Sequence, residues 1–238
     1  MTGHPLDNPA WHALGGPHAR FGESWGSLRR YLPQFSAFIA AESADARAGL
    51  AGFLPRGDFG VVIIPDAIEA PEGVEVYLDG HGVQMVAERP LIAPVAIEPI
   101  ALGAGDVPEM MALVELTQPG PFADRTVEIG RYIGVRDSGR LVAMAGERMH
   151  LPGYCEVSAV CTHPDYRGRG LAKQLMSEVM SGIIARGETP FLHARAGNAD
   201  AIRLYESLGF TLRTDVHFTV LRHIGTSDEA IPTFLRRH

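Results

Sequence analysis

The stretch that decides the fold reads Val160-Cys161-Thr162-His163-Pro164-Asp165-Tyr166-Arg167-Gly168-Arg169-Gly170-Leu171-Ala172. An apolar, β-prone run ends at a His-Pro-Asp turn, and an Arg-Gly-Arg-Gly segment follows it. The spacing of Leu171, Leu175 and Val179 then predicts a helix. A glycine-rich turn between a strand and a helix N-terminus presents unpaired backbone N–H groups, which favour a phosphate. Gly168 and Gly170 allow a ligand to approach this backbone closely.

A second informative stretch follows the first in the chain and reads Asn198-Ala199-Asp200-Ala201-Ile202-Arg203-Leu204-Tyr205-Glu206-Ser207-Leu208-Gly209-Phe210. Together the two stretches resemble the signatures of the GNAT superfamily of N-acetyltransferases. Arg167, Gly170 and Ala172 fit its acyl-CoA-binding pattern, Arg/Gln-x-x-Gly-x-Gly/Ala. Within the superfamily, the C-terminal part is most similar to glycine N-acyltransferase-type enzymes and their bacterial relatives.

The resemblance implies an α/β (α+β) fold of the GNAT type. Its mixed central β-sheet is flanked by helices, and its central strands splay apart beside a bulge. We expect a GNAT acetyltransferase domain over residues 95–238. Residues 1–94 carry no recognisable chemical motif, and their patterns predict an additional N-terminal α/β region of unknown role.

Hydrophobic periodicity, turn residues and capping residues predict the individual elements. We expect a helix over residues 44–53, a strand over 60–64, a hairpin of strands 74–78 and 83–86 around Asp79-Gly80-His81-Gly82, a helix over 106–116 with a capping box of Asp106 and Glu109, strands over 132–136, 141–149 and 154–162, a helix over 169–186, a strand over 191–194, a helix from Asn198 to Gly209, and closing strands over 210–213 and 216–222.

Composition excludes several classes of protein. The 238 residues are 46% hydrophobic and 21% charged, as in ordinary globular proteins, and the net charge of −7 argues against nucleic-acid binding. No apolar run reaches the ~20 residues of a membrane span, and no secretory signal is visible. The two cysteines, Cys155 and Cys161, lie in one predicted strand and are too far apart for a disulfide. Reduced thiols fit a cytoplasmic protein. Abundant Ala, Gly and Arg suggest a bacterial source, and a homodimer is compatible with the sequence.

The resemblance implies acetyl-CoA as cosubstrate and assigns a set of residues to it. The residues expected to bind it are Val160, Cys161, Thr162, Arg167, Gly168, Arg169, Gly170, Leu171, Ala172, Lys173, Asn198, Ala201 and Tyr205. Lys173 is the only lysine of the chain and has an alternative interpretation as an exposed, solvated side chain. Asn198 is also expected to cap its helix.

The resemblance further implies that Tyr205 is the general acid that protonates the departing thiolate. The alternative is a tyrosine that packs in an amphipathic helix. Some members of the superfamily place their general base at the position of Glu156, and burial there would raise its pKa toward neutrality. The alternative is a carboxylate ion-paired with Arg148. Glu147 is the less favoured candidate base.

The expected reaction is direct attack of a primary amine on the thioester. A small molecule such as an amino acid is the first choice of acceptor, with Phe122, Arg125 and Arg148 expected to bind it. A protein or peptide amine is the alternative, and a non-catalytic acyl-CoA sensor is the alternative of another class. An acyl-cysteine at Cys161 is disfavoured because no histidine stands beside it in the sequence. The ten histidines show no metal-ligand spacing, so no metal is expected.

Overall fold

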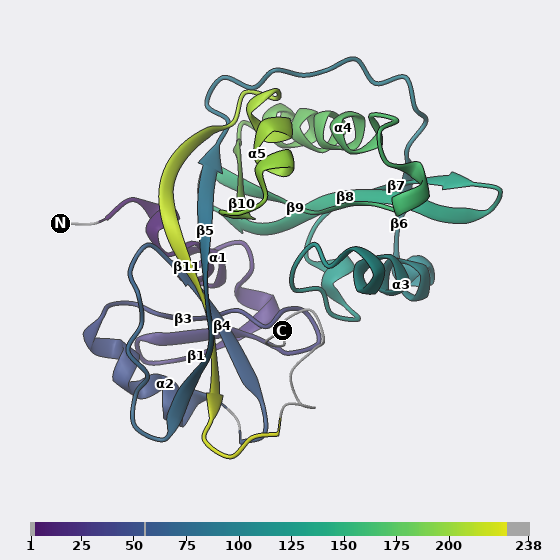
Figure 1. The fold of residues 1–238 in the computed structure, drawn as a ribbon. Coiled ribbons are helices and arrows are strands. Elements are labelled where there is room, and N and C mark those ends of the chain that lie inside the picture. The colour runs from purple at the N-terminus through teal and green to yellow at the C-terminus, as the bar shows by residue number, and fades with distance from the viewer. Residues whose placement is uncertain (1–2, 55, 228–238) are drawn as a thin grey trace.

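A computed structural model describes residues 3–54 and 56–227 (Figure 1). A large mixed sheet has the strand order β4-β11-β5-β10-β9-β8-β7-β6. Its strands are β4 (Phe59–Ile64), β5 (Val74–Val86), β6 (Ile100–Leu102), β7 (Tyr132–Asp137), β8 (Arg140–Leu151), β9 (Tyr154–Thr162), β10 (Thr189–Arg195) and β11 (Thr211–His223). A smaller antiparallel sheet contains β1 (Gly22–Trp25), β2 (Leu28–Tyr31) and β3 (Ile39–Ala41). The expected mixed α/β architecture is therefore confirmed.

Helices cover both faces of the large sheet. Figure 1 shows α4 (Leu171–Ala185) and α5 (Ala199–Glu206) on one side and α3 (Val107–Thr117) on the other. Helix α4 buries Leu175, Val179 and Ile183, whose spacing keeps them on one face against the sheet. Two short helices, α1 (Pro9–Leu14) and α2 (Leu50–Phe53), lie in the N-terminal part. None of the helices in the described ranges is long and apolar enough to cross a bilayer.

Strands from both halves of the chain share the large sheet. Strand β5 pairs antiparallel with β10 and β11, and β4 pairs with β11. A division of the chain near residue 94 therefore separates β4 and β5 from their hydrogen-bonded partners. The division into two domains stays a prediction.

The hairpin expected around Asp79-Gly80-His81-Gly82 is wrong, because residues 74–86 form the single strand β5. Glycine serves close packing here rather than a turn. A Cβ on Gly82 would lie 2.8 Å from the carbonyl oxygen of Ala194 and 3.2 Å from a methyl of Val216. The strand thus fits tightly between β10 and β11.

Three smaller expectations also differ from the structure. The two expected closing strands form one strand, β11, with an irregularity between Leu212 and Thr214. Residues 45–49 form a 3-10 helix ahead of the short α2. No side chain caps α3, since the Asp106 carboxylate accepts from the Gly103 N–H and from Arg136 instead.

The predicted bulge and splay are confirmed. Ala159 has a φ of 51°, and the β8–β9 register shifts beside it. Strands β9 and β10 run parallel and pair only where residues 189–191 lie opposite residues 154–156. Beyond Glu156 the two strands separate toward their carboxyl ends. Crevices at the carboxyl ends of parallel strands are where ligands bind in open α/β sheets.

Candidate functional site

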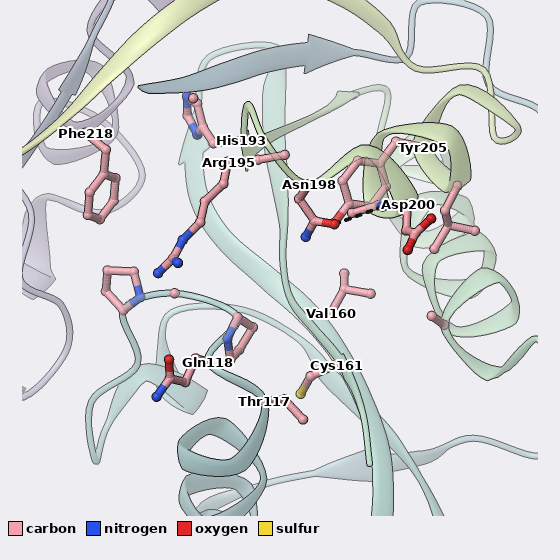
Figure 2. A pocket seen from close by; sticks show the side chains of 18 of the residues that line it. Thr117, Gln118, Val160, Cys161, His193, Arg195, Asn198, Asp200, Tyr205 and Phe218 are labelled. Atoms are coloured by element: carbon pink, nitrogen blue, oxygen red, sulfur yellow. Dashed lines mark hydrogen bonds between the residues drawn. The ribbon is translucent and has the colours of Figure 1, made fainter. Parts of the chain in front are cut away.

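A cavity of about 1380 Å³ opens where β9 and β10 separate (Figure 2). Its walls come from β4, β5, β8, β9, β10, β11, α5, the segment 117–121 at the end of α3, and the turn before α4 with the first residues of that helix. Pockets for one small molecule usually hold about 300–1,000 Å³. The larger volume suits a site that must hold two reactants.

One end of the cavity is formed by residues 167–173, which comprise the turn before α4 and the first residues of that helix and are here called the glycine turn. Gly168 and Gly170 have φ values of 76° and 74°, and Gly170 is the N-cap residue of α4. No side chain of the described residues caps this helix, so its first backbone N–H groups remain available. Arg167 and Lys173 line the cavity here, and neither side chain has a hydrogen bond or an ion pair among the described residues. This arrangement of N–H groups and cations favours the binding of a phosphate group.

The structure brings most of the expected cosubstrate residues together. Those that line the cavity are Val160, Cys161, Thr162, Arg167, Gly168, Gly170, Leu171, Ala172, Lys173, Asn198, Ala201 and Tyr205. Arg169 does not line it, because its guanidinium stacks over the Tyr166 ring and donates to the Asp165 carbonyl.

The end of β9 contributes an unsatisfied polar atom. Thr162 lines the cavity, and its Oγ1 is buried without a hydrogen-bond partner in the described structure. A buried hydroxyl without a partner is costly and is readily explained by a ligand. The neighbouring Cys161 is buried, and burial raises its pKa to about 12. This thiol stays protonated near neutrality, which disfavours an acyl-cysteine.

Tyr205 and Asn198 project from α5 and the turn before it (Figure 2). Burial raises the pKa of Tyr205 to about 12, so its phenol carries its proton at neutral pH. Oδ1 of Asn198 accepts from the backbone N–H of Ala201 at 3.2 Å, which confirms the expected helix cap. Both side chains line the cavity.

Glu156 lies in a buried ion pair. Its carboxylate is fully buried and accepts from Nε and Nη2 of Arg148 at 2.8 and 2.6 Å. Nδ1 of His193 lies 2.7 Å from the same carboxylate. Burial alone would raise the pKa of Glu156, but Arg148 and His193 lower it to about 2. The ion pair weighed as the alternative for Glu156 is therefore present, and Glu156 does not line the cavity.

The hydrogen-bond roles of the two His193 ring nitrogens follow from its neighbour Gln84. Oε1 of Gln84 accepts from Arg213 at 2.7 Å, and its Nε2 donates to the carbonyl of Leu6 at 2.8 Å. The same Nε2 lies 3.0 Å from Nε2 of His193, so the imidazole nitrogen must accept. His193 then carries its proton on Nδ1 and donates it to Glu156. Both ring nitrogens of His193 are therefore engaged within the protein.

The expected acceptor residues do not gather in the cavity. Phe122 is buried against Tyr132. Arg125 is exposed and binds Glu128 through two hydrogen bonds. Arg148 alone lines the cavity, and its charge is matched by Glu156.

His193 and Arg195 are among the polar cavity residues that the sequence analysis did not predict. Both lie at the carboxyl end of β10, two residues apart and a few residues ahead of Asn198. Polar residues at that position follow the general rule for ligand sites in open α/β sheets. This spacing was the signal that could have found them.

Glu147, the less favoured candidate base, lies outside the cavity with His150 and Cys155. Their potential ligand atoms lie within 4.8 Å of one another. Hydrogen bonds within the protein account for this cluster. His150 Nε2 lies 3.1 Å from both Glu147 and Cys155, and Arg186 donates to the other oxygen of Glu147.

Comparisons with known proteins agree with this geometry. The model of the FR47-like protein family matches residues 132–219. A crystal structure from Novosphingobium aromaticivorans, assigned to the GNAT family of acetyltransferases, is 46% identical with a TM-score of 0.88, covering 93% of this chain and 99% of that one. The N-alpha-acetyltransferase RimI of Mycobacterium tuberculosis is 32% identical over 48% of this chain and 79% of its own length. A ribosomal protein bS18-alanine N-acetyltransferase of Salmonella typhimurium is 29% identical over 55% of this chain and 94% of its own.

Proposed function

Since this chain belongs to the GNAT superfamily of acetyltransferases, we propose that it moves the acetyl group of acetyl-CoA to the primary amine of a small molecule. The glycine turn is the observation that carries the proposal. It combines two glycines of positive φ with a helix N-terminus and two cations, Arg167 and Lys173, at one end of a cavity that reaches Tyr205. Within the described ranges, no side chain caps this helix and neither cation has a partner.

The donor side of the cavity fits acetyl-CoA, the cosubstrate of this superfamily. Backbone N–H groups of the glycine turn would bind its phosphates. The unsatisfied Oγ1 of Thr162 and the backbone of Val160 to Thr162 would contact the pantetheine arm. Separation of β9 from β10 leaves strand edges that can pair with this amide-containing arm.

Glu156 has no route to the amine, since it is fully buried and its carboxylate is held by Arg148 and His193. Its low pKa also makes it a weak base. We propose that Glu156 positions Arg148 and His193 and that the amine loses its proton to water in the cavity. Substrate contact by Phe122 or Arg125 has no support from their placement.

We prefer a small-molecule acceptor because the walls of the cavity extend beyond the part of the chain that matches a protein acetyltransferase. Residues from Ile63 to Phe218 line it, a longer stretch of chain than the match to the Mycobacterium tuberculosis relative covers. The sequence match to that relative therefore does not identify the acceptor of this chain. A peptide N-terminus is the second candidate, favoured by the names of the relatives that acetylate a ribosomal protein.

A panel of amines with acetyl-CoA and detection of free thiol tests the proposal. We expect amine-dependent release of CoA and an acetylated small molecule by mass spectrometry. Release of CoA only in the presence of peptides with a free N-terminus would instead identify a peptide as the acceptor. Tight acetyl-CoA binding without thiol release from any amine would instead indicate a non-catalytic sensor.

Tyr205→Phe should lower kcat by at least about tenfold, the low end for loss of a general acid, with little change in the KM for acetyl-CoA. The phenol is protonated at neutral pH and lines the cavity, and phenylalanine preserves its ring contact with Phe210. Tyr154→Phe is the matched control, because its hydroxyl bonds His4 outside the cavity. Steady-state kinetics near pH 7 measure both variants. Equal kcat values for them would make Tyr205 a packing residue.

A further inference from the structure

Three positively charged side chains line the cavity without a partner among the described residues. Arg167 and Lys173 belong to the glycine turn, where phosphates are expected. The third is Arg195, at the carboxyl end of β10. The remaining cavity arginine, Arg148, is neutralised by Glu156. Arg195 therefore contributes a positive charge that no side chain in the described part of the chain balances.

Arg195 lies on the side of the cavity away from Tyr205. Figure 2 shows its guanidinium extending from β10 into the cavity, with Phe218 on one side and Asn198 and Tyr205 on the other. Phe218 belongs to β11, which together with β5 and the segment 117–121 walls this part of the cavity. We call this part the acceptor side.

Acetyl-CoA does not supply the missing negative charge. All the charges of this cosubstrate are on its phosphates, and those phosphates have their own cations and backbone N–H groups at the glycine turn. Its pantetheine arm and thioester are neutral. An anion at Arg195 must therefore come from the other substrate.

We propose that Arg195 binds an oxyanion of the acceptor, so that the substrate class is a small amine that also carries a carboxylate or a phosphate. The planar guanidinium donates two parallel hydrogen bonds to such a group and fixes its orientation. The inference rests on the proposed function and names its substrate class. Arg195 thus takes the anion-binding role that the sequence analysis gave to Arg125 or Arg148, since both of those arginines are already paired with a glutamate.

The test compares pairs of amines that differ only in the anion: glycine with glycinamide, β-alanine with β-alaninamide, and O-phosphoethanolamine with ethanolamine. The wild-type protein should prefer the anionic member of at least one pair. The preferred pair identifies the anion as carboxylate or phosphate. Arg195→Gln should reduce that preference, measured as a ratio of kcat/KM, by about 10- to 100-fold, as for the loss of a charged hydrogen-bonded pair.

The loss should appear in the KM of the anionic acceptor, while the KM for acetyl-CoA stays within a few-fold. Arg195→Lys, which keeps the charge but not the planar fork, should recover part of the preference. Arg131→Gln is the matched control, because this exposed arginine pairs with Glu178 outside the cavity.

Two outcomes distinguish failure of the anion site from failure of the proposed function. Equal use of both members of every pair, unchanged by Arg195→Gln, would overturn the anion site and leave the proposed function intact. Acetyl-CoA binding without acetylation of any amine would defeat the proposed function and this inference with it.

Discussion

Glu156→Gln should lower the free energy of unfolding by about 3–5 kcal/mol, the usual cost of leaving one partner of a buried ion pair without the other. Glutamine keeps the size of the side chain but leaves the Arg148 guanidinium, only 8% exposed, without a counter-charge. It also replaces one of the two carboxylate oxygens by an NH2 donor, so that Arg148 and His193 must share a single acceptor oxygen. Urea unfolding at pH 7 measures the loss.

Glu128→Gln is the control for this result, because Glu128 also binds an arginine through two hydrogen bonds, but on the surface. Exposed ion pairs contribute little, so this variant should unfold close to the wild type. Equal effects of the two substitutions would show that burial does not govern the Arg148–Glu156 pair. Replacing both Arg148 and Glu156 by apolar residues should restore part of the stability.

The same pair predicts how stability depends on pH. The pKa of Glu156 falls from its ordinary 4.5 to about 2 in the folded protein. A lowered carboxyl pKa stabilises the fold fully above its ordinary value, and the contribution disappears as the pH falls from about 4.5 toward 2. The wild type should therefore lose more stability than Glu156→Gln across this interval. Parallel curves for the two proteins would contradict the lowered pKa.

Kinetics of Glu156→Gln distinguish positioning from proton transfer. A general base that is lost can be replaced in part by deprotonation of the amine in solution, so high pH would restore activity. A positioning residue leaves a loss of kcat that does not depend on pH. We expect the second pattern, since the carboxylate does not line the cavity.

Local patterns explain why the donor side of the cavity was predictable from the sequence. A strand, a glycine-rich turn and a helix N-terminus are contiguous in the chain, and their geometry depends on neighbours within a few residues. The cap formed by Asn198 is equally local. Residues 160–173 and 198–205 could therefore be placed almost completely before the fold was known.

The acceptor side depends on contacts between distant residues, which a single sequence does not reveal. Arg125, Arg148 and Arg195 are chemically identical, and only the tertiary structure shows that the first two are paired while Arg195 has no partner among the described residues. Glu156 was assigned a raised pKa from burial alone, whereas the charge of Arg148 reverses the direction. His193, 37 residues away, joins the same carboxylate.

Glycine was the other source of error, because it serves turns and close packing alike. Gly80 and Gly82 indicate a hairpin when they are considered alone. In the fold, the missing side chain of Gly82 admits the backbone of β10 and a side chain of β11. Gly168 and Gly170 have the positive φ that a turn requires, so the same residue type gave a correct prediction there.

The glycine turn gives the second large effect. Gly170→Val should weaken CoA binding about a hundredfold or more while the protein stays folded. Valine at a φ of 74° is strained, so the turn must change its conformation, and the N–H groups at the start of α4 lose their alignment. Loss of two charge-assisted hydrogen bonds, about 1.5–3 kcal/mol each, accounts for this factor. Isothermal titration calorimetry with CoA measures it.

Gly187→Val is a matched control at the opposite end of the same helix. Gly187 has a φ of 78°, and a Cβ added there would meet no atom within 4 Å. A Cβ added at Gly170 would meet only the end of the Gln174 side chain, at 3.9 Å. Both substitutions therefore impose similar backbone strain of about 1–2 kcal/mol, but Gly187 lies outside the cavity. Similar melting temperatures with a loss of affinity in Gly170→Val alone would locate the phosphates at the glycine turn. Should Gly170→Val fail to fold, Gly170→Ala provides a milder test of the same strain. Wild-type affinity in a folded Gly170 variant would remove the glycine turn as the CoA site.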